Sequence, residues 1–485
     1  MIKLFKTAIC LALLAMLGSC SNFLDENIKN SATPSNFYNT VEEGQAAVNG
    51  IYTVLYDIFT DINFFVSAEG ATDLMVTPDS RLLTGAFGYS ASTPIAGQNI
   101  WQSSYKGIMY ANNAIDAINK SPMSDAEKKP LIAEAVFLRS LYYYFLTSTF
   151  NDVPYWDYGL TSEEAVNHTL SLPRSSADSI RNVLMDDLET HAPDLVLTAR
   201  GRATQGAAYG LMARIALFNK NWEKARWAAE QVIDSHTYSL LNNYADASNT
   251  KNSKESVFEI QFTYSATGTQ RPSNIFIYCM PTPKNDTFYD GVDMGSSTAT
   301  TYGTIKPTRR LVSYYADNDK RKPFVLGYTY NGQEFNRSKN QHLPWLGPKF
   351  WDFNAVNIAS GKNMLFMRYS DVLLMMGEAL IELDELDDAK YYIDLVRNRA
   401  GIGGILVTDQ ATMREELHKE RARELAGEFT RRWDIVRWGT FYQDIKSVAP
   451  DYAVAANNVR PYNLYYPIPA LEIAKNPALV QNPGY

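Results

Sequence analysis

Apolar residues in this chain recur at spacings of three and four over several long stretches, which is the period of one face of an α-helix. We predict helices over residues 41–59, 100–118 and 126–150, the last of them ended by the turn that leads to Pro154. Each stretch presents an apolar stripe that must be buried against another element. The sequence therefore predicts a mostly α-helical fold.

Later predicted helices come in pairs separated by short turns. Residues 203–218 are followed by 222–233, and residues 369–383 are followed by 387–399. This pattern resembles tetratricopeptide hairpins, although the pairs are interrupted rather than in tandem. Small residues stand where two packed helices would approach most closely: Ala207, Ala213, Ala225, Ala229, Ala379 and Ala389.

The first 19 residues have the form of a secretory signal. Lys3 and Lys6 precede an apolar run, residues 8–17, which is too short to span a bilayer. The run ends at Leu17-Gly18-Ser19-Cys20, which resembles the bacterial lipobox. That resemblance implies that Cys20 is lipidated, and two or three acyl chains make an anchor effectively permanent at about 0.8 kcal/mol per buried CH₂. Residues 20–40 are polar and turn-rich, so we interpret them as the lipidated tether.

The mature chain is acidic and poor in cysteine. Residues 1–19 contain two of the 45 basic residues and none of the 53 acidic ones, so the remaining chain carries a net charge of −10. This balance argues against nucleic acid or anionic lipid as the main partner, since both favour a basic surface. With Cys10 in the signal and Cys20 lipidated, only Cys279 remains. No internal disulfide can form, and the fold must depend on its apolar core.

The sequence pattern changes between residues 239 and 364. Residues 255–262 alternate as a strand does, and the rest is rich in Gly, Pro, Asn, Thr and Ser with scattered aromatic residues. A segment of more than a hundred residues with weak periodicity inside a compact chain more often carries a functional site than not. We therefore expect this segment to carry function.

Seven segments carry distinctive motifs. They are 101–118, 133–154 (with Asn151 before Asp-Val-Pro), 201–217 (opening Gly-Arg-Ala-Thr), 368–379 (with Ser370 in its first turn), 396–401 (ending Arg-Asn-Arg-Ala-Gly), 420–439 (ending Arg-Trp-Gly) and the tail from Tyr-Pro-Ile-Pro to Gln-Asn-Pro-Gly-Tyr. These segments, in this order over most of residues 20–485, resemble the SusD/RagB family of Bacteroidetes outer-membrane lipoproteins, with Asn151 replacing a glycine and Ser370 an alanine. The gap at 239–364 corresponds to the region where members of that family differ most and where their ligand specificity tends to reside.

The resemblance implies a mostly α fold in which about four tetratricopeptide-like hairpins support a loop-rich ligand-binding face with few short strands. It divides the chain after the tether into an N-terminal helical part (41–238), a variable ligand region (239–364) and a C-terminal helical part with a Pro-rich tail (365–485), packed as one unit. It also implies capture of an oligosaccharide or polysaccharide and its delivery to a SusC-like TonB-dependent outer-membrane transporter. Asp25-Glu26 resembles the acidic signal that sends such lipoproteins to the cell exterior.

We predict ligand contacts in two loop regions. Flat rings stack on the apolar faces of sugars, and carboxylate, amide and guanidinium groups bind sugar hydroxyls. The N-terminal region contributes Asp73, which resembles the family's early acidic residue near its ligand loops, and also Arg81, Phe87 and Tyr89. The variable region contributes Phe288, Tyr289, Tyr302, Tyr328, Trp345 and Trp351.

The sequence shows no catalytic constellation. The five histidines have no metal-ligand spacing, and no nucleophile elbow, phosphate loop or dinucleotide fingerprint occurs. Glu416, Glu420 and Glu424 fall on one helix face, but the basic residues around them favour ionised carboxylates and a lattice of ion pairs that locks the last helices together. We therefore predict a binding protein with no catalytic residues, no metal and no cofactor.

Two alternative functions stay open at this point. A peptide- or protein-fragment-binding subunit of a RagA-like transporter would have exposed strand edges or a deep charged pocket. A glycan-cleaving enzyme would have two carboxylates facing each other across a cleft, with no arginine in contact.

Overall fold

The structure of the 485-residue chain is a computed structural model. It describes residues 38–93, 96–264, 271–281, 288–289, 292–293, 300–335, 344–407 and 409–485. The predicted signal, the predicted lipidation site Cys20 and all but the last three residues of the predicted tether lie outside these ranges.

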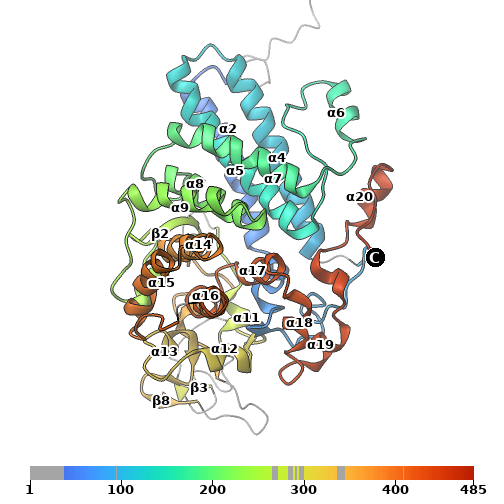
Figure 1. Ribbon diagram of the computed structural model, residues 1–485. Coiled ribbons are helices and arrows are strands. Elements are labelled where there is room, and N and C mark those ends of the chain that lie inside the picture. The colour runs from blue at the N-terminus through green and yellow to red at the C-terminus, as the bar shows by residue number, and fades with distance from the viewer. Residues whose placement is uncertain are drawn as a thin grey trace, which may run out of the picture.

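The N-terminal half supplies four long helices, in blue to green at the top of Figure 1. Each of them packs on the next one in chain order. These helices are α2 (Val41–Phe59), α4 (Ala96–Lys120), α5 (Asp125–Phe150) and α7 (Ala177–His191).

Four more helices continue this stack. Helix α8 packs on α7 and α9, and α14 returns from far along the sequence to pack on α9 and α15 (Figure 1). The eight helices therefore form a row of four hairpins, α2/α4, α5/α7, α8/α9 and α14/α15, which is the mostly α, tetratricopeptide-like architecture predicted from the sequence. The second four helices are α8 (Gln205–Phe218), α9 (Trp222–Asp234), α14 (Tyr369–Glu382) and α15 (Leu386–Ala400).

Local sequence signals set the ends of these helices. The hydroxyl of Thr40 accepts the N–H of Glu43, and the Glu43 carboxylate accepts the N–H of Thr40, so a reciprocal capping box starts α2. Helix α15 ends at Gly401, which has a φ of +79° and satisfies the last carbonyls in the left-handed conformation that glycine adopts without strain. The predicted bounds of α2, 41–59, are confirmed at both ends.

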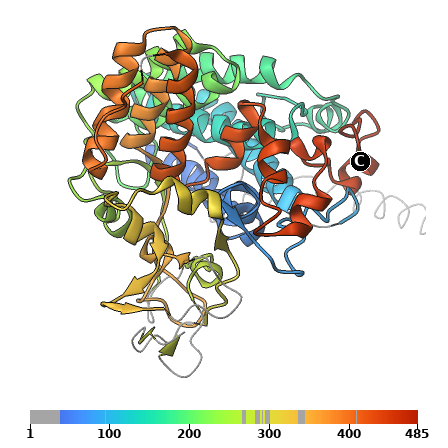
Figure 2. The same cartoon turned by 60° about the horizontal axis from the view of Figure 1, so that its bottom comes forward.

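The segment between α9 and α14 has short elements and forms the lower part of Figure 1, while in Figure 2 its yellow strands project away from the helices. The one sheet in it with longer strands pairs β2 (Ser256–Ile260) with β10 (Met364–Arg368) in antiparallel register, Met364 opposite Ile260. The other described strands have two residues each: β1 (Met75–Val76), β3 (Phe288–Tyr289), β4 (Val292–Asp293), β5 (Lys306–Pro307), β6 (Leu326–Gly327), β7 (Thr329–Tyr330), β8 (Gln333–Glu334) and β9 (Trp345–Leu346).

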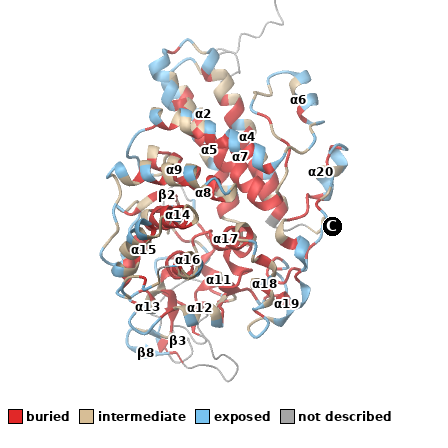
Figure 3. Cartoon of the chain, viewed as in Figure 1, coloured by how far each residue is buried: buried red, intermediate tan, exposed pale blue. Residues whose placement is uncertain are grey.

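Shorter helices connect and cover these parts. Figure 3 shows buried residues along α5 and α7, whereas α6 and α20 are largely exposed. The described short helices are α3 (Ile62–Phe65), η1 (Val66–Gly70), α6 (Glu163–Thr169), η2 (Ala192–Asp194), α10 (Tyr244–Asn249), α11 (Phe276–Cys279), α12 (Arg309–Tyr314), α13 (Lys322–Val325), η3 (Pro348–Phe350), α17 (Arg431–Arg437), α18 (Phe441–Lys446), α19 (Ala453–Asn458), η4 (Pro461–Leu464) and α20 (Ala470–Lys475). The longer helix α16 (Gln410–Leu425) packs on α14 and α15 outside the row of hairpins. None of the helices in the described part of the chain is long and apolar enough to cross a membrane.

Aromatic rings join the helical stack to the β2/β10 sheet. The fully buried ring of Phe59 on α2 lies 6.0 Å from Phe145 on α5 and 6.1 Å from Phe366 on β10, measured between ring centroids. Phe64 and Phe429 complete the cluster, at 5.1 and 4.9 Å from Phe59. Edge-to-face pairs of this kind add about 0.5–1.5 kcal/mol each beyond the area they bury.

A buried group of ion pairs joins the loop-rich part to the last helices. The carboxylate of Glu424 on α16 accepts hydrogen bonds from Arg321 (2.8 Å), Arg368 (3.0 Å) and Arg399. We call these four residues the Glu424 cluster, and their side chains are at most 5% exposed. Burial alone would raise the pKa of Glu424, but the three guanidinium charges outweigh it and hold the pKa well below its usual range.

The predicted lattice of ion pairs around Glu416, Glu420 and Glu424 is confirmed. Glu420 is fully buried and bonds Arg321 (2.6 Å) and Arg423 (2.7 Å). Glu416 lies at the edge, 26% exposed, with Lys419 at 2.8 Å. These carboxylates are paired with cations on the same or neighbouring elements, so they hold helices together.

We expect Glu424→Gln to lower the free energy of unfolding by about 3–5 kcal/mol, because removing one partner of a buried ion pair leaves uncompensated charge. Glu416→Gln, on the same helix but partly exposed, should cost less than about 1 kcal/mol. Urea unfolding followed by circular dichroism measures both values. Equal losses in the two variants would contradict the importance given to the Glu424 cluster.

Candidate functional site

A two-residue ladder brings the two predicted loop regions together. Strand β1 pairs antiparallel with β5, with Met75 opposite Pro307 and Val76 opposite Lys306. Beyond the ladder, Thr308 donates its N–H to the carbonyl of Leu74 (2.9 Å). The loop that follows β1 and the loop that precedes β5 therefore lie side by side.

At the end of this ladder, three side chains form an open surface that we call the platform: Arg81, Tyr278 and Tyr302. The Arg81 guanidinium lies 5.9 Å from the centroid of the Tyr302 ring, within the range of a cation–π contact. The rings of Tyr278 and Tyr302 are 5.7 Å apart and tilted by 54°. The Arg81 side chain is 71% exposed and Tyr302 is 43% exposed, so both are available to a ligand.

The backbone holds the platform in place. Tyr302 donates its N–H to the carbonyl of Ile277 (2.6 Å), and Ile305 donates to the carbonyl of Tyr278 (2.9 Å), which ties the loop before β5 to α11. Arg81 is oriented by two hydrogen bonds to the carboxylate of Asp79, at 2.9 and 2.6 Å. These bonds lower the pKa of Asp79, so the pair stays ionised at neutral pH.

The chemistry of the platform suits binding. Two phenol rings offer flat apolar faces with hydroxyl groups at their edges, and the guanidinium offers hydrogen-bond donors in a fixed plane. Burial raises the pKa of Tyr278, so its hydroxyl is neutral. The nearby carboxylate of Asp79 is already bonded to Arg81. The arrangement can stack on a ligand with an apolar face and bind its hydroxyl groups.

Asp73, predicted as a ligand contact, is fully buried. Its carboxylate accepts hydrogen bonds from Arg431 (2.8 and 2.6 Å) and Arg310 (3.0 Å). Burial raises its pKa, but the charges of the two arginines outweigh that effect and the pKa is lowered. Both oxygens are occupied, so in this structure Asp73 holds α12 and α17 together.

Phe87 and Tyr89 were predicted beside Arg81, but their rings turn inward. Phe87 is 6% exposed and lies 6.0 Å from Phe441. Tyr89 is 7% exposed and stacks on Tyr466 at 4.9 Å. Neither ring offers a free face to a ligand in this structure.

The predicted tryptophans are also buried. Trp345 is 7% exposed, with the ammonium of Lys306 3.5 Å from its ring centroid. Trp351 is 3% exposed and meets Tyr330, Phe335 and Phe353 edge to face. Both therefore pack inside the loop-rich part.

The remaining predicted residues lie elsewhere in this part. Tyr328 is partly buried beside β6. Phe288 and Tyr289 form β3, and their side chains are outside the described part of the structure.

The sequence analysis did not select Tyr278. It follows the apolar run Ile275-Phe276-Ile277 at the start of α11, a run that lacks the turn-forming residues that surround Tyr302. Only the pairing of β1 with β5 shows that these two tyrosines and Arg81 come together.

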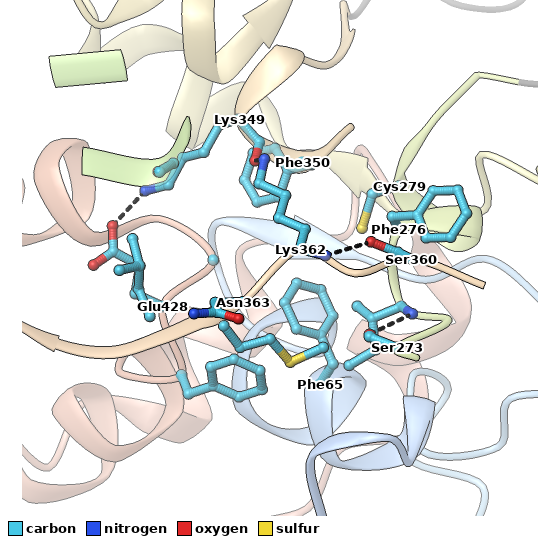
Figure 4. Close-up of a pocket in the computed structure, with 16 residues that line it drawn as sticks. Phe65, Ser273, Phe276, Cys279, Lys349, Phe350, Ser360, Lys362, Asn363 and Glu428 are labelled. Carbon is cyan, nitrogen blue, oxygen red and sulfur yellow. Dashed lines mark hydrogen bonds and ion pairs between the residues drawn. The ribbon is translucent and has the colours of Figure 1, made fainter. Parts of the chain in front are cut away.

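A small cavity lies beside Lys349 and Phe350 of η3 (Figure 4). It is lined by Phe276, Cys279 and Lys362 and closed by the ion pair of Lys349 with Glu428 (2.6 Å). Its volume is about 90 Å³, well below the roughly 300–1,000 Å³ of small-molecule pockets. Burial raises the pKa of the Cys279 thiol and lowers that of Lys362 to about 8. The cavity has room for a few waters and not for a sugar ring.

Within the described ranges, no three His, Cys, Asp or Glu side chains are grouped so that they could hold a metal ion.

Comparison with known proteins gives consistent matches over the chain. Residues 326–485 match the family model described as "SusD family", and residues 22–217 match the model described as "Starch-binding associating with outer membrane". Residues 218–325, which contain Tyr278 and Tyr302, lie between the two matched ranges. SusD-like protein P25 of Formosa agariphila is 26% identical over 96% of this chain and 97% of its own length.

Solved structures share the fold. A SusD superfamily protein from Bacteroides vulgatus superposes with a TM-score of 0.78 at 22% identity, over 93% of this chain and 100% of its own. Surface glycan-binding protein A from Bacteroides uniformis superposes with a TM-score of 0.74 at 22% identity, over 91% of this chain and 99% of its own.

The burial of the candidate rings predicts different costs for removing them. Trp351→Ala should lower the free energy of unfolding by about 3–5 kcal/mol, since it removes a buried aromatic side chain. Tyr302→Ala should cost less than about 1 kcal/mol, because Tyr302 is 43% exposed and lies at the edge of the core. Urea unfolding monitored at 222 nm gives both values. A large loss for Tyr302→Ala would mean that its ring is a packing residue.

Proposed function

Because this chain belongs to the SusD/RagB family, we propose that it is a surface glycan-binding protein that captures an oligosaccharide or polysaccharide. The platform of Arg81, Tyr278 and Tyr302 is the observation that carries this proposal, since exposed rings beside a fixed guanidinium are suited to sugar faces and hydroxyls. The glycan-binding protein from Bacteroides uniformis, which has the same fold, supports it.

The cellular setting follows from the N-terminal sequence and the family. Cys20 would carry the lipid anchor, and the chain would face the cell exterior from the outer membrane. The description of the model that matches residues 22–217 supports association with the outer membrane. A SusC-like TonB-dependent transporter would receive the captured glycan.

The protein is a binding protein and not an enzyme. Among the described residues, two carboxylates act on the platform tyrosine Tyr278, those of Asp79 and Asp61. Arg81 holds Asp79 ionised, and Asp61 accepts hydrogen bonds from Asn63 (2.9 Å) and Asn99 (3.1 Å). A glycosidase needs a second carboxyl group with a raised pKa on the other side of the bond to be cleaved. The carboxylates of Glu420 and Glu424 face arginines inside the protein instead.

The alternative ligand is a peptide delivered to a RagA-like transporter. Peptide capture by strand addition needs an exposed edge of several residues. Most residues of the two longer strands, β2 and β10, are buried, and the other described strands have two residues each. The geometry therefore favours a glycan over a peptide.

We expect the purified protein to bind at least one oligosaccharide from a panel of maltoheptaose, laminarihexaose, xylohexaose and mannohexaose without releasing reducing sugar. Tyr302→Ala should weaken that binding about tenfold, because a stacked ring contributes roughly 1–1.5 kcal/mol. Isothermal titration calorimetry measures the affinity, and a reducing-end assay is run on the same samples.

The matched control is Tyr391→Ala, which removes an exposed ring (59%) from α15, away from the loop-rich part. If Tyr302→Ala bound the oligosaccharide with unchanged affinity, the platform would not be the binding site. Binding of peptides with no glycan binding would favour the RagA-like alternative, and steady release of sugar would contradict the binding-only function.

A further inference from the structure

The loop-rich part has a second opening, larger than the cavity of Figure 4. It has a volume of about 490 Å³, which falls within the range of small-molecule pockets. We call it the groove. Its walls are the end of α10, the stretch that follows β2, and residues 351–354 and 361–363 on either side of a tight turn.

One wall of the groove presents aromatic rings. Phe353 is 36% exposed, and Tyr330 stacks against its covered face at 5.0 Å and 25°. The edge of Phe353 rests on the buried Trp351. Phe324 and Tyr264 are partly exposed and line the groove as well. The Phe353 ring is therefore supported from behind and open in front, as a stacking surface must be.

The cations that line the groove are already bonded within the protein. The ammonium of Lys251 donates to the carbonyl of Phe262 (2.7 Å). The ammonium of Lys362 donates to the carbonyls of Lys349 (2.7 Å) and Trp351 (3.2 Å). These partners are neutral carbonyl oxygens, so the bonds orient the two ammonium groups without neutralising their charge.

The carboxylates that line the groove are bonded too. Glu259 accepts the N–H of Asn252 (3.0 and 3.1 Å) and the side-chain amide of Asn363 (2.7 Å). Asp352 accepts the N–H of Asn354 (2.9 Å) and the hydroxyl of Ser360. Two lysines and two carboxylates line the groove, so the charges of its lining sum to zero and favour neither an anionic nor a cationic ligand.

Neutral polar groups remain available. Among the described residues, nothing hydrogen-bonds to the side-chain amides of Asn249 and Asn354 or to the hydroxyl of Tyr264. Asn249 and Asn354 are both exposed. An amide can donate and accept at the same time, which matches the vicinal hydroxyls of a sugar.

We propose that the groove is a second carbohydrate subsite, in which an uncharged pyranose stacks on Phe353 and hydrogen-bonds Asn249 and Asn354. This inference rests on the proposed function, because it takes the same class of ligand.

The groove and the platform can serve one glycan chain. The N–H of Thr300 donates to the carbonyl of Asn357 (2.8 Å). Tyr302 follows Thr300 by two residues, and Phe353 precedes Asn357 by four. Since an extended chain spans at most about 3.6 Å per residue, the two rings' backbones lie no more than roughly 30 Å apart. Two weak subsites on one chain raise the overall affinity above that of either.

The test uses the panel oligosaccharide that binds the purified protein most tightly, together with the trisaccharide of the same linkage. We expect calorimetry to give two trisaccharides per protein for the wild type and one for Phe353→Ala. The affinity for the longer oligosaccharide should fall about threefold to tenfold in Phe353→Ala. Asn354→Ala removes an exposed side chain that makes no hydrogen bond with the described residues, so the stability of the protein should not change. Its affinity for the longer oligosaccharide should also fall.

The outcomes separate the two proposals. One trisaccharide per wild-type protein, lost in Tyr302→Ala and unchanged in Phe353→Ala and Asn354→Ala, would overturn the second subsite and leave the proposed function standing. Binding lost in Phe353→Ala and retained in Tyr302→Ala would support the groove and overturn the platform. No binding of any panel sugar to the wild type would overturn both.

Discussion

The buried carboxylate of Glu424 fixes the loop-rich part to the helices. Arg321, Arg368 and Arg399 reach it from the start of α13, the end of β10 and helix α15, so four separate segments meet at one charge. Burying ions costs several kcal/mol each, and a well-packed apolar cluster could be equally stable. We infer that the cluster supplies geometry, since a guanidinium satisfies its hydrogen bonds in few orientations. The loop-rich part has short strands, so few backbone hydrogen bonds between strands hold its segments in register. Buried ion pairs such as those of the Glu424 cluster fix these segments instead.

Buried carboxylates also fix the segment that leads to the platform. Asp73 is held between Arg310 and Arg431 just before β1. One turn earlier, the carboxylate of Glu69 accepts three backbone N–H groups at the start of α17. Burial raises the pKa of Glu69 to about 7, although those hydrogen bonds act in the opposite direction. The loop that carries Arg81 therefore leaves a rigid base, which reduces the ordering cost that binding must overcome.

The helical stack and the ion pairs could be predicted from the sequence, whereas the site could be predicted only in part. Periodicity and capping residues are local signals, and they predict α2 with its observed bounds. Helix α7 (Ala177–His191) has the same kind of apolar stripe, but the sequence analysis did not predict it. An aromatic residue in a loop carries no signal of which way it faces. Tyr89 is buried because Tyr466, from the far end of the chain, stacks on it. Arg81 and Tyr302 meet through a two-residue ladder that no periodicity reveals.

Hydrogen–deuterium exchange of the protein without ligand tests most directly whether the Glu424 cluster holds the loop-rich part on the helices. Three amide hydrogen bonds report on it: Tyr369 to the carbonyl of Glu255, Gly347 to that of Val325, and Tyr302 to that of Ile277. If the Glu424 cluster holds the loop-rich part rigidly on the helices, these amides exchange about as slowly as those inside α5. Exchange of all three within seconds, while α5 stays protected, would show that the loop-rich part and its junction with α14 open readily, and would contradict the account.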